Sequence, residues 1–272
     1  MESDLQRRIQ RYGWDKAANF YETYWQQQLE PAQTLLLKMA NLHEGERVLD
    51  VACGTGLLSF RAAAIIGNDG SLLGTDISDN MVRTSRTIAL EKGIRNVSFE
   101  RMDAEELQVP DSSFNAVLCG LGLMYFPDPP KALKEMFRAL KSGGRAVAAV
   151  WGQRSRCGWA EIFPIVDSRV KSEVCPLFFQ SGTGTILQQI FLQAGFTNVV
   201  SERIDTRLHY DSPEEACGAA FVGGPVALAY SRFNDDMRKE VHAEYLASIE
   251  KYKNGSGYDV PGEFVVTCGY RE

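Results

Sequence analysis

Residues 48–59 read Val-Leu-Asp-Val-Ala-Cys-Gly-Thr-Gly-Leu-Leu-Ser, and no other stretch says as much about the architecture of this chain. The apolar run that begins at Arg47 predicts a short buried strand, and the apolar spacing from Leu57 onward predicts a helix. Between them, Gly54 and Gly56 let the backbone turn sharply and approach a ligand closely. The free amide groups of the following helix would face whatever lies over this turn. The stretch therefore predicts a strand, a ligand-binding turn and a helix in succession.

The turn alone does not separate a nucleoside site from a dinucleotide site, because dinucleotide-binding proteins carry a similar glycine turn. Here Asp50 closes the strand before the turn, and Ser59 stands where a third glycine would allow close packing against a pyrophosphate. A second apolar run over 71–76 ends in Asp76, whose carboxylate could accept hydrogen bonds from both hydroxyls of a ribose. These residues favour a nucleoside without a diphosphate.

Five segments in order resemble the class I S-adenosylmethionine-dependent methyltransferases, and within them the ubiquinone/menaquinone-biosynthesis-like group that acts on small molecules. They are VLDVACGTG at 48–56, LLGTDIS at 72–78, the turn at 102–105, FNAVLCGLGLMYFPD at 114–128 and LKSGGRAVAAVWG at 140–152. The resemblance spans roughly residues 45 to 152, a little under half of the chain. It implies S-adenosylmethionine as the cofactor and methyl transfer to a small-molecule acceptor.

The resemblance also implies which residues contact the methionine part of the cofactor. Asp50 would face its ammonium group, directly or through water, and the backbone of Gly54 and Gly56 would pack against the ligand. Thr55 at the tip of the turn could offer its hydroxyl or its amide. The segment after the fourth strand would contact the same part of the cofactor through Cys119, Gly120 and Leu121.

The nucleoside part would be held by the second and third turns. Asp76 would bind the ribose diol, with Ile77 and Met81 against the adenine face. By the same resemblance, Asp103 would accept a hydrogen bond from the exocyclic amine, and the backbone amide of Ala104 would meet a ring nitrogen. An acidic residue that merely caps a strand end is the structural alternative for each carboxylate.

Aromatic residues indicate the acceptor side, although each of them could equally be a core residue. The ligand crevice of an open α/β sheet lies outside the carboxyl ends of its strands, where Tyr125, Trp151 and Trp159 are expected. Phe221 is a further candidate from the later chain. The N-terminal helix resembles a lid of related enzymes, in which a tyrosine closes over the cofactor, and Tyr21 is the residue we select.

Alternating strand and helix patterns predict an α/β protein with a Rossmann-like, seven-stranded, mostly parallel sheet and helices on both faces. By resemblance, the last strand is antiparallel, and a helical cap completes the fold. We expect strands over 46–51, 71–76, 96–101, 113–119, 144–151, 196–209 and 263–270. We expect helices over 4–28, 31–42, 57–66, 79–92, 129–141, 159–171 and 183–194, and a helical segment over 214–252 broken around 223–225.

Three regions follow from this map. Residues 1–43 would form an N-terminal helical lid, 44–151 the cofactor-binding core, and 152–272 the remainder of the sheet with the cap. The cap itself would comprise 152–182 and 211–258 and would carry acceptor specificity. A buttress for the sheet or a dimer interface is the alternative role for these segments, so a homodimer stays open.

The chemistry needs little from the protein beyond alignment and desolvation, because the methyl group of a sulfonium is already activated. A strong catalytic base is therefore optional, and the catalytic residues stay undefined. None of His43, His209 and His242 falls within a motif; His209 is a weak candidate because it follows a strand beside the expected cap.

Composition narrows the remaining classes. A net charge of −6 and a pI near 5.3 argue against nucleic acid, and the short Arg7, Arg8 and Arg11 cluster is expected to be a solvated helix face. The sequence contains no apolar run of 18 residues and no apolar signal core, so we expect a cytoplasmic protein without a membrane span. Six scattered cysteines without a Cys-x-x-Cys pair indicate buried thiols rather than disulfides, and no metal site. A protein or RNA methyltransferase, and a catalytically silent S-adenosylmethionine-binding protein, remain as alternatives.

Overall fold

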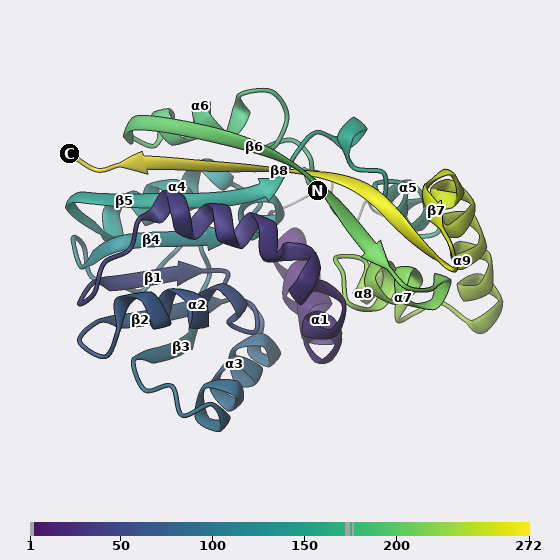
Figure 1. Ribbon diagram of the computed structural model, residues 1–272, viewed down its shortest axis with the longest axis horizontal. Helices are drawn as coiled ribbons and strands as arrows, with labels where there is room; N and C mark the ends of the chain where they lie inside the picture. Colours follow the sequence, from purple (N-terminus) through teal and green to yellow (C-terminus); the bar gives the residue numbers. More distant parts are fainter. Residues whose placement is uncertain (1–2, 172–174, 176) are drawn as a thin grey trace.

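A twisted sheet with the strand order β3-β2-β1-β4-β5-β8-β6 organises the part of the chain that the structure describes, residues 3–171, 175 and 177–272 of a computed structural model (Figure 1). Its parallel strands are β1 (Arg47–Val51), β2 (Ser71–Asp76), β3 (Val97–Arg101), β4 (Phe114–Gly120) and β5 (Leu140–Trp151). The last long strand, β8 (Gly257–Tyr270), runs antiparallel between β5 and β6 (Thr197–Tyr210), and the short β7 (Lys253–Asn254) pairs with β8. The expected Rossmann-like sheet with an antiparallel last strand is confirmed.

Helices cover both faces of this sheet. Figure 1 shows α1 (Ser3–Ala40) in front of the sheet and α4 (Pro129–Ala139) behind it. On the side of α1 lie α2 (Leu57–Ile66) and α3 (Asp79–Glu91), which both contact α1, while α6 (Ile186–Gln193) contacts α4. Local chemistry sets their starts: the Ser78 hydroxyl accepts from the Met81 amide, and the Asp128 carboxylate accepts from the Lys131 amide. These caps fix the amide ends of α3 and α4 just after the carboxyl ends of β2 and β4.

The N-terminal helix differs from the prediction, because one helix replaces the two that were expected over 4–28 and 31–42. It continues through Pro31 from Ser3 to Ala40. A proline inside a helix removes one backbone hydrogen bond. Pro31 is exposed, so the carbonyl that it leaves unbonded can bind water, while Leu35 and Leu36 keep the helix packed on the core. Burial of the apolar face outweighs the local cost of the proline.

The helical cap stands on a ribbon formed by the distal halves of β6 and β8. It contains α5 (Ile162–Asp167), α7 (Pro213–Cys217), the π-helical turn η3 (Gly218–Val222), α8 (Ala227–Tyr230) and α9 (Asp235–Ile249). Three single turns, η1 (Leu123–Tyr125), η2 (Arg154–Arg156) and η4 (Glu250–Tyr252), join the larger elements. The helix expected over 159–171 is shorter, and the segment over 214–252 is divided into three helices and the η3 turn. The last strand is longer than expected, because its first half pairs with β6 beyond the end of β5.

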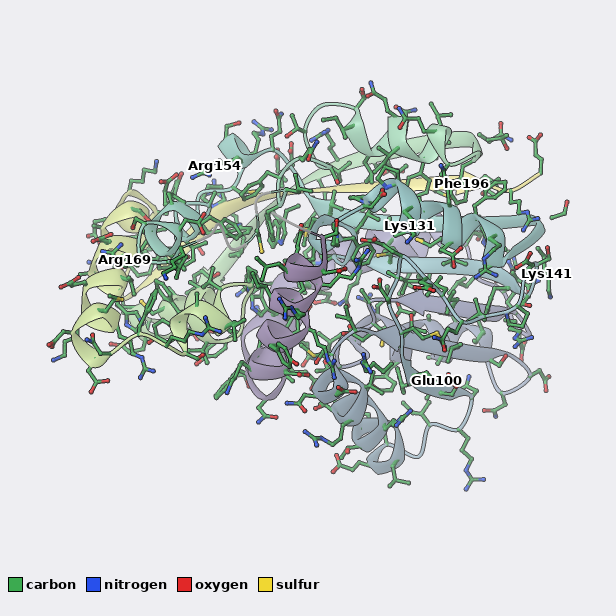
Figure 2. The ribbon with its side chains drawn as sticks, turned by 180° about the vertical axis from the view of Figure 1, so that it is seen from behind. Glu100, Lys131, Lys141, Arg154, Arg169 and Phe196 are labelled. Carbon is green, nitrogen blue, oxygen red and sulfur yellow. The ribbon has the colours of Figure 1, made fainter. Side chains whose placement is uncertain are left out.

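The core fills both sides of the central strands. The side chains of Val48, Leu49, Val117, Leu118 and Val147 are fully buried. Among the residues labelled in Figure 2, Glu100, Lys131 and Lys141 are exposed, whereas Phe196 is buried. The six cysteines are free and buried. Among the described helices, none combines the length and the apolar character that crossing a bilayer requires.

Candidate active site

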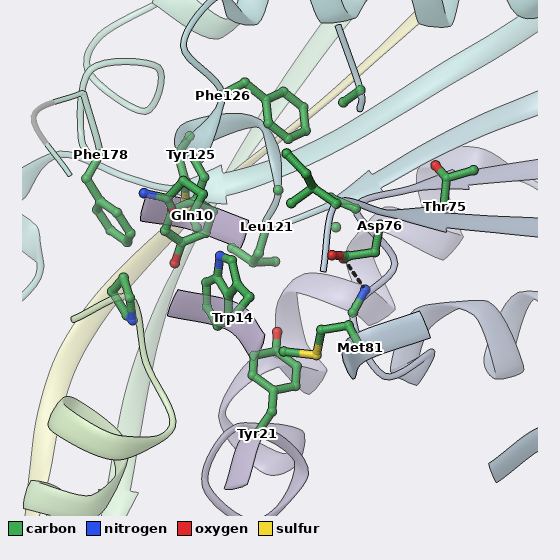
Figure 3. A pocket seen from close by; sticks show the side chains of 18 of the residues that line it. Gln10, Trp14, Tyr21, Thr75, Asp76, Met81, Leu121, Tyr125, Phe126 and Phe178 are labelled. Atoms are coloured by element: carbon green, nitrogen blue, oxygen red, sulfur yellow. Dashed lines mark hydrogen bonds between the residues drawn. The ribbon is translucent and has the colours of Figure 1, made fainter. Parts of the chain in front are cut away.

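One cavity lies at the carboxyl ends of the parallel strands, where open α/β sheets bind their ligands (Figure 3). Its lining falls into two parts. The carboxylate half is lined by Arg7, Ala52, Gly54, Thr75, Asp76, Ile77, Met81, Met102, Asp103 and Ala104. The aromatic half is lined by Gln10, Trp14, Trp25, Leu29, Tyr125, Trp151, Trp159, Phe178 and Pro225. Tyr21, Gly120, Leu121, Gly122, Met124, Phe126 and Pro127 complete the wall.

Two tight turns form the floor of the cavity, one after β1 and one after β4. Ala52 and Leu121 both adopt left-handed backbone conformations, with φ of 57° and 64°. Such conformations are costly for residues with a Cβ and persist only where the surrounding structure holds them. Gly54 and Gly56 also have positive φ, 56° and 95°. The two turns approach each other so closely that a Cβ on Gly122 would lie 2.4 Å from the Cβ of Ala52.

Asp76 stands at the end of β2 and joins two segments. Its carboxylate accepts a hydrogen bond from the Gly54 amide and another from the Ser78 amide, both of 2.9 Å. Burial raises the pKa of this carboxyl group to about 6, although the two amides partly counteract that effect. Further acceptor capacity remains on the two oxygens for a ligand that lies in the cavity.

Asp50 lies behind the glycine turn, and its side chain is fully buried. One carboxylate oxygen accepts a hydrogen bond of 2.5 Å from the hydroxyl of Ser59 in the first turn of α2. The other oxygen has no hydrogen-bond partner among the described residues. Burial, with a smaller contribution from the nearby Asp76, raises the pKa of this carboxyl group to about 7, although the hydrogen bond from Ser59 partly counteracts the shift. An unpaired, buried carboxylate oxygen is costly, and a cationic group in its vicinity would remove that cost.

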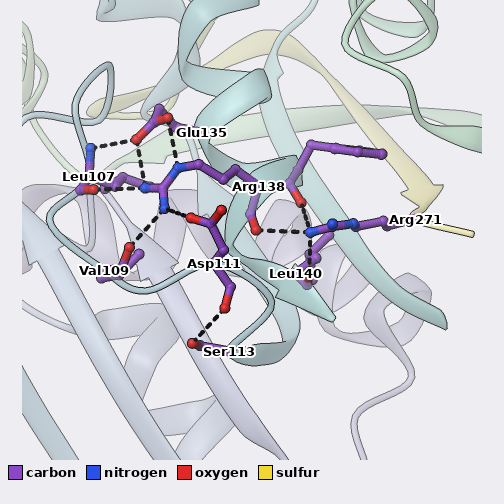
Figure 4. A network of polar contacts seen from close by, with 9 residues as sticks. Leu107, Val109, Asp111, Ser113, Glu135, Arg138, Leu140 and Arg271 are labelled. Carbon is purple, nitrogen blue, oxygen red and sulfur yellow. Dashed lines mark hydrogen bonds and ion pairs between the residues drawn. The ribbon is translucent and has the colours of Figure 1, made fainter. Parts of the chain in front are cut away.

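The third turn, after β3, is fixed from two sides. Asp103 accepts from the backbone amide of Glu105 at 2.9 Å, and its other oxygen pairs with Nε of Arg7 at 3.0 Å. On the far side, Arg138 donates to the carbonyl oxygens of Leu107 and Val109, both at 2.8 Å (Figure 4). The turn is therefore held between the N-terminal helix and α4.

Comparison with known proteins agrees with this geometry. Residues 42–164 match the family described as "Methyltransferase domain". A demethylmenaquinone methyltransferase of Listeria monocytogenes is 38% identical over 127 residues, which are 47% of this chain and 54% of that protein. Residues 42–164 form a class I S-adenosylmethionine-dependent methyltransferase domain. Its cofactor is S-adenosylmethionine.

Solved structures agree with the fold beyond this domain. The Bacillus subtilis YcgJ protein superposes with a TM-score of 0.62 at 19% identity, over 89% of this chain and 98% of that one. A phosphoethanolamine N-methyltransferase of Haemonchus contortus, solved with S-adenosylhomocysteine, gives 0.60 at 16% identity, over 89% and 53%. At this identity the likeness concerns the fold. The chain spans about half the length of the curated relatives that it matches.

Most of the predicted site residues of the methyltransferase domain line the cavity. Those that line it are Tyr21, Gly54, Asp76, Ile77, Met81, Asp103, Ala104, Gly120, Leu121, Tyr125, Trp151 and Trp159. Four predicted residues, Asp50, Thr55, Gly56 and Cys119, are buried behind its wall. Thr55 Oγ1, like Asp50 Oδ1, has no hydrogen-bond partner among the described residues.

Two predicted residues lie elsewhere. Phe221 is fully buried in the cap, where its ring packs 5.2 Å from that of Tyr230 and 5.0 Å from that of His242. His209 lies in a separate surface hollow lined by residues of α1 and β6, and its ring pairs with Asp259 at 2.7 Å and Asp211 at 3.2 Å. Neither residue is among those that line the methyltransferase cavity.

The contacts of the N-terminal arginines differ from the prediction. Arg7 and Arg11 were expected to form a solvated helix face, but Arg7 pairs with Asp103 and Glu105, and Arg11 pairs with Asp79 at 2.5 Å. Gln10 lines the cavity as well. The signal was present in the spacing, since Arg7 and Arg11 are four residues apart and therefore lie on one face of a helix.

The buried polar atoms of the methyltransferase domain fit S-adenosylmethionine. The unpaired oxygen of Asp50 suits the ammonium group of its methionine part, and the remaining acceptor capacity of Asp76 suits the ribose diol. The aromatic half offers no such charge, because the charged residues among the described lining, Arg7, Asp76 and Asp103, all belong to the carboxylate half. The cavity is thus chemically divided between its two halves.

Proposed function

We propose that this protein transfers a methyl group from S-adenosylmethionine to a small, flat, uncharged acceptor. The observation that carries the proposal is the division of one cavity into a carboxylate half and an aromatic half. The first half offers the charges that a nucleoside with an amino acid side arm requires. The second offers ring surfaces and few polar atoms, which suits an aromatic acceptor such as a quinol or a phenol.

In the carboxylate half, this chain would hold the cofactor at both ends. Asp76 would accept from the ribose hydroxyls, and Asp103 from the exocyclic amine of adenine, while Asp50 would compensate the ammonium charge. Ile77 and Met81 would cover the adenine face. The cofactor supplies an activated methyl group, so the protein needs to orient the acceptor and exclude water.

In the aromatic half, rings meet mostly edge to face. The centroid of Trp14 lies 5.1 Å from that of Tyr125, and the centroid of Trp151 lies 4.9 Å from that of Trp159. Tyr125 also packs 5.4 Å from Phe178. A flat ring placed among such walls would be oriented by shape and kept away from water.

Indole donors are the polar atoms that could recognise an acceptor oxygen. Trp25 Nε1 and Trp159 Nε1 are buried and have no hydrogen-bond partner in the part of the chain that the structure describes. Both tryptophans line the cavity. Since an indole only donates, either would favour a carbonyl, hydroxyl or phenolate oxygen and would disfavour an ammonium group.

Proton transfer would need little help from the protein. Burial raises the pKa of the Tyr21 and Tyr125 hydroxyl groups above the ordinary value, so both stay neutral near pH 7. A neutral phenol is a poor base, and the described lining contains no histidine. Alignment and desolvation are therefore the means by which this cavity would accelerate the transfer.

Each of the three proposed regions contributes residues to the cavity. Residues 1–43 would act as a lid through Gln10, Trp14 and Trp25, and residues 44–151 supply the carboxylate half apart from Arg7. The proposed cap contributes Trp159 and Phe178 from 152–182 and Pro225 from 211–258. These contacts favour a specificity role for the cap over a pure buttress.

The alternatives have less support. A methyltransferase for protein or RNA would need an opening for a large substrate and, for RNA, a basic surface that a net charge of −6 disfavours. A catalytically silent S-adenosylmethionine-binding protein would need the carboxylate half of the cavity but not the aromatic half.

Titration calorimetry with S-adenosylmethionine tests the carboxylate half first. Radiolabelled transfer to a panel of a quinol, a phenol, an amine and a thiol then tests the aromatic half. We expect the neutral rings to react and aliphatic amines not to react. Trp159→Phe, which keeps the ring but removes the donor, should reduce turnover with the ring acceptor, whereas Tyr12→Phe on the exposed face of α1 should not. Binding without transfer to any acceptor would favour the silent alternative.

A further inference from the structure

Three side chains on one face of α1 reach across to the carboxylate half of the cavity. Arg7, Arg11 and Asp15 are spaced four residues apart, so they form a stripe along the helix. Together they meet two segments of the core: Arg7 contacts the turn after β3, and Arg11 and Asp15 contact the start of α3. The stripe thus touches the segments that carry Asp76 and Asp103.

Arg7 fixes the turn that carries Asp103. Its Nε lies 3.0 Å from one oxygen of Asp103, and its Nη2 pairs with Glu105. The Glu105 side chain is only 2% exposed, and its other oxygen accepts from the Asp128 amide at 2.9 Å. The planar guanidinium group of Arg7 contacts the carboxylates of Asp103 and Glu105 and so restricts the orientation of both, which the single ammonium group of a lysine could not reproduce.

Asp15 acts on the other carboxylate through Ser78. Its oxygen accepts from the Ser78 hydroxyl at 2.6 Å and from the Asn80 amide at 3.0 Å. Asn80 donates in return from its side-chain nitrogen to the Asp15 carbonyl at 2.9 Å. The backbone amide of Ser78 in turn donates to Asp76. Asp15 therefore fixes the residue that orients the carboxylate of Asp76.

We propose that Arg7 and Asp15 are positioning residues, and that each one tunes the recognition of a different part of the cofactor. Arg7 sets Asp103 for the adenine amine, and Asp15, through Ser78, sets Asp76 for the ribose diol. The inference rests on the proposed function, which assigns those two cofactor groups to those two carboxylates. It makes α1 a component of cofactor recognition in addition to a cover.

The test compares three ligands on the full-length protein by titration calorimetry: S-adenosylhomocysteine, its analogue with hypoxanthine in place of adenine, and its 2′-deoxyribose analogue. Wild-type protein should bind the parent ligand most tightly. The affinity for the parent ligand divided by that for the hypoxanthine analogue, which we call the adenine preference, reports on Asp103, because hypoxanthine has no exocyclic amine. The affinity for the parent ligand divided by that for the deoxyribose analogue, which we call the ribose preference, reports on Asp76, because the deoxyribose lacks one hydroxyl.

The variants should separate the two ratios. Arg7→Gln should reduce the adenine preference by about tenfold and leave the ribose preference within about twofold. Asp15→Ala should do the reverse, with a loss of about fivefold in the ribose preference. Arg7→Lys should fail to restore the adenine preference, and Asp15→Asn, which keeps an acceptor oxygen, should largely retain the ribose preference.

Exposed neighbours provide the controls, since Arg8→Gln and Lys16→Gln change the same helix without reaching the cavity. Both should keep wild-type ratios.

If Arg7→Gln and Asp15→Ala lower all three affinities equally, or change none, α1 is only a cover and the inference is wrong. If wild-type protein does not bind S-adenosylhomocysteine, the proposed function itself fails before the variants are compared. Circular dichroism of each variant identifies any that misfold; Arg7→Lys then replaces Arg7→Gln, and Asp15→Ser, whose shorter side chain places no oxygen at the position of Oδ1, replaces Asp15→Ala with the same expected loss of ribose preference.

Discussion

The carboxylate of Asp76 accepts a hydrogen bond of 2.9 Å from the backbone amide of Gly54, so the end of β2 holds the turn that follows β1. The same carboxylate lines the cavity. One side chain therefore shapes the glycine turn and would bind the ribose. Its loss should affect the site twice, through the missing contact and through the loosened turn.

Asp76→Ala should weaken cofactor binding by about 2–4 kcal/mol, or roughly 30-fold to 1000-fold, on the scale of hydrogen bonds to charged groups. Titration calorimetry with S-adenosylhomocysteine measures the change. Asp69→Ala, at an exposed position just before β2, is the matched control and should bind as wild type does. An affinity of Asp76→Ala within threefold of wild type would contradict the assignment.

Cofactor affinity should rise with pH between about 5.5 and 8. Burial raises the pKa of Asp50 to about 7 and that of Asp76 to about 6, so both groups ionise across this interval. A cationic ammonium group and a donating diol both favour the ionised carboxylates. Calorimetric titrations at several pH values provide the measurement. A flat profile would show that the two carboxyl groups are already ionised at pH 5.5 or do not contact the ligand.

Asp50→Asn should stabilise the cofactor-free protein at pH 8 while weakening cofactor binding by at least about tenfold. A carboxyl group with a raised pKa in the folded state contributes stability below about pH 4, and this contribution is lost as the pH rises through about 7. The amide avoids that loss and can still accept from Ser59, so the free energy of unfolding at pH 8 should rise by about 1–3 kcal/mol. Urea denaturation at pH 8 and pH 5 checks this. An equal effect at both pH values would exclude the charge as its cause.

Gly122→Ala should force apart the turns after β1 and β4, because the added Cβ would lie 2.4 Å from that of Ala52. We expect a destabilisation of about 1–3 kcal/mol and a clear loss of cofactor affinity. Ala52→Gly in the same chain should restore both, since it removes the clashing methyl group and suits the left-handed backbone at position 52. Thermal denaturation and calorimetry of the single and double variants provide the comparison. A double variant no better than Gly122→Ala would locate the damage elsewhere.

His209→Ala should lower turnover by less than about tenfold, because general base catalysis typically contributes more than that. The residue lies in a different hollow from the methyl-transfer cavity. Its hydrogen bond to Asp259 raises the pKa of the imidazole, so its contribution to stability is present below the ordinary pKa of histidine and is lost as the pH rises through the raised pKa. Turnover with a reactive acceptor from the panel is the measurement. A hundredfold loss with unchanged cofactor affinity would make His209 the base after all.

Local sequence was sufficient to predict the elements of the fold that would bind the nucleoside. Strand β2 and helix α2 have the predicted bounds, 71–76 and 57–66, because each is a short apolar pattern bounded by glycine, aspartate or a turn. The carboxylates at the ends of β1 and β2 followed from the same pattern. Such features depend on neighbouring residues only, and they need no knowledge of tertiary contacts.

The missed features depend on contacts between distant segments. Arg7 reaches Glu105 across 98 residues, and Gln28 holds the backbone of His209 across 181 residues. Pro31 appeared to begin a new helix, and only the burial of the leucines that follow it explains why α1 continues. In the same way, the sequence predicted Phe221 as a cavity residue, but the packing of the cap buries it in the interior. Periodicity cannot show which distant side chain will meet a given face.

The pairing of β6 with β8 has a consequence for how such proteins can diversify. From Val200 opposite Cys268 to Tyr210 opposite Tyr258 the register is unbroken, and β5 ends opposite Phe264, so the two strands continue past the sheet as a ribbon. Everything from α7 to β7 is inserted between the tips of this ribbon. Lengthening, shortening or exchanging the insert leaves the sheet untouched, so acceptor range could change by grafting at the ribbon. A chimaera that receives residues 206–262 from a relative should keep its nucleoside recognition, and its acceptor range should change only through the part of the wall that Pro225 contributes.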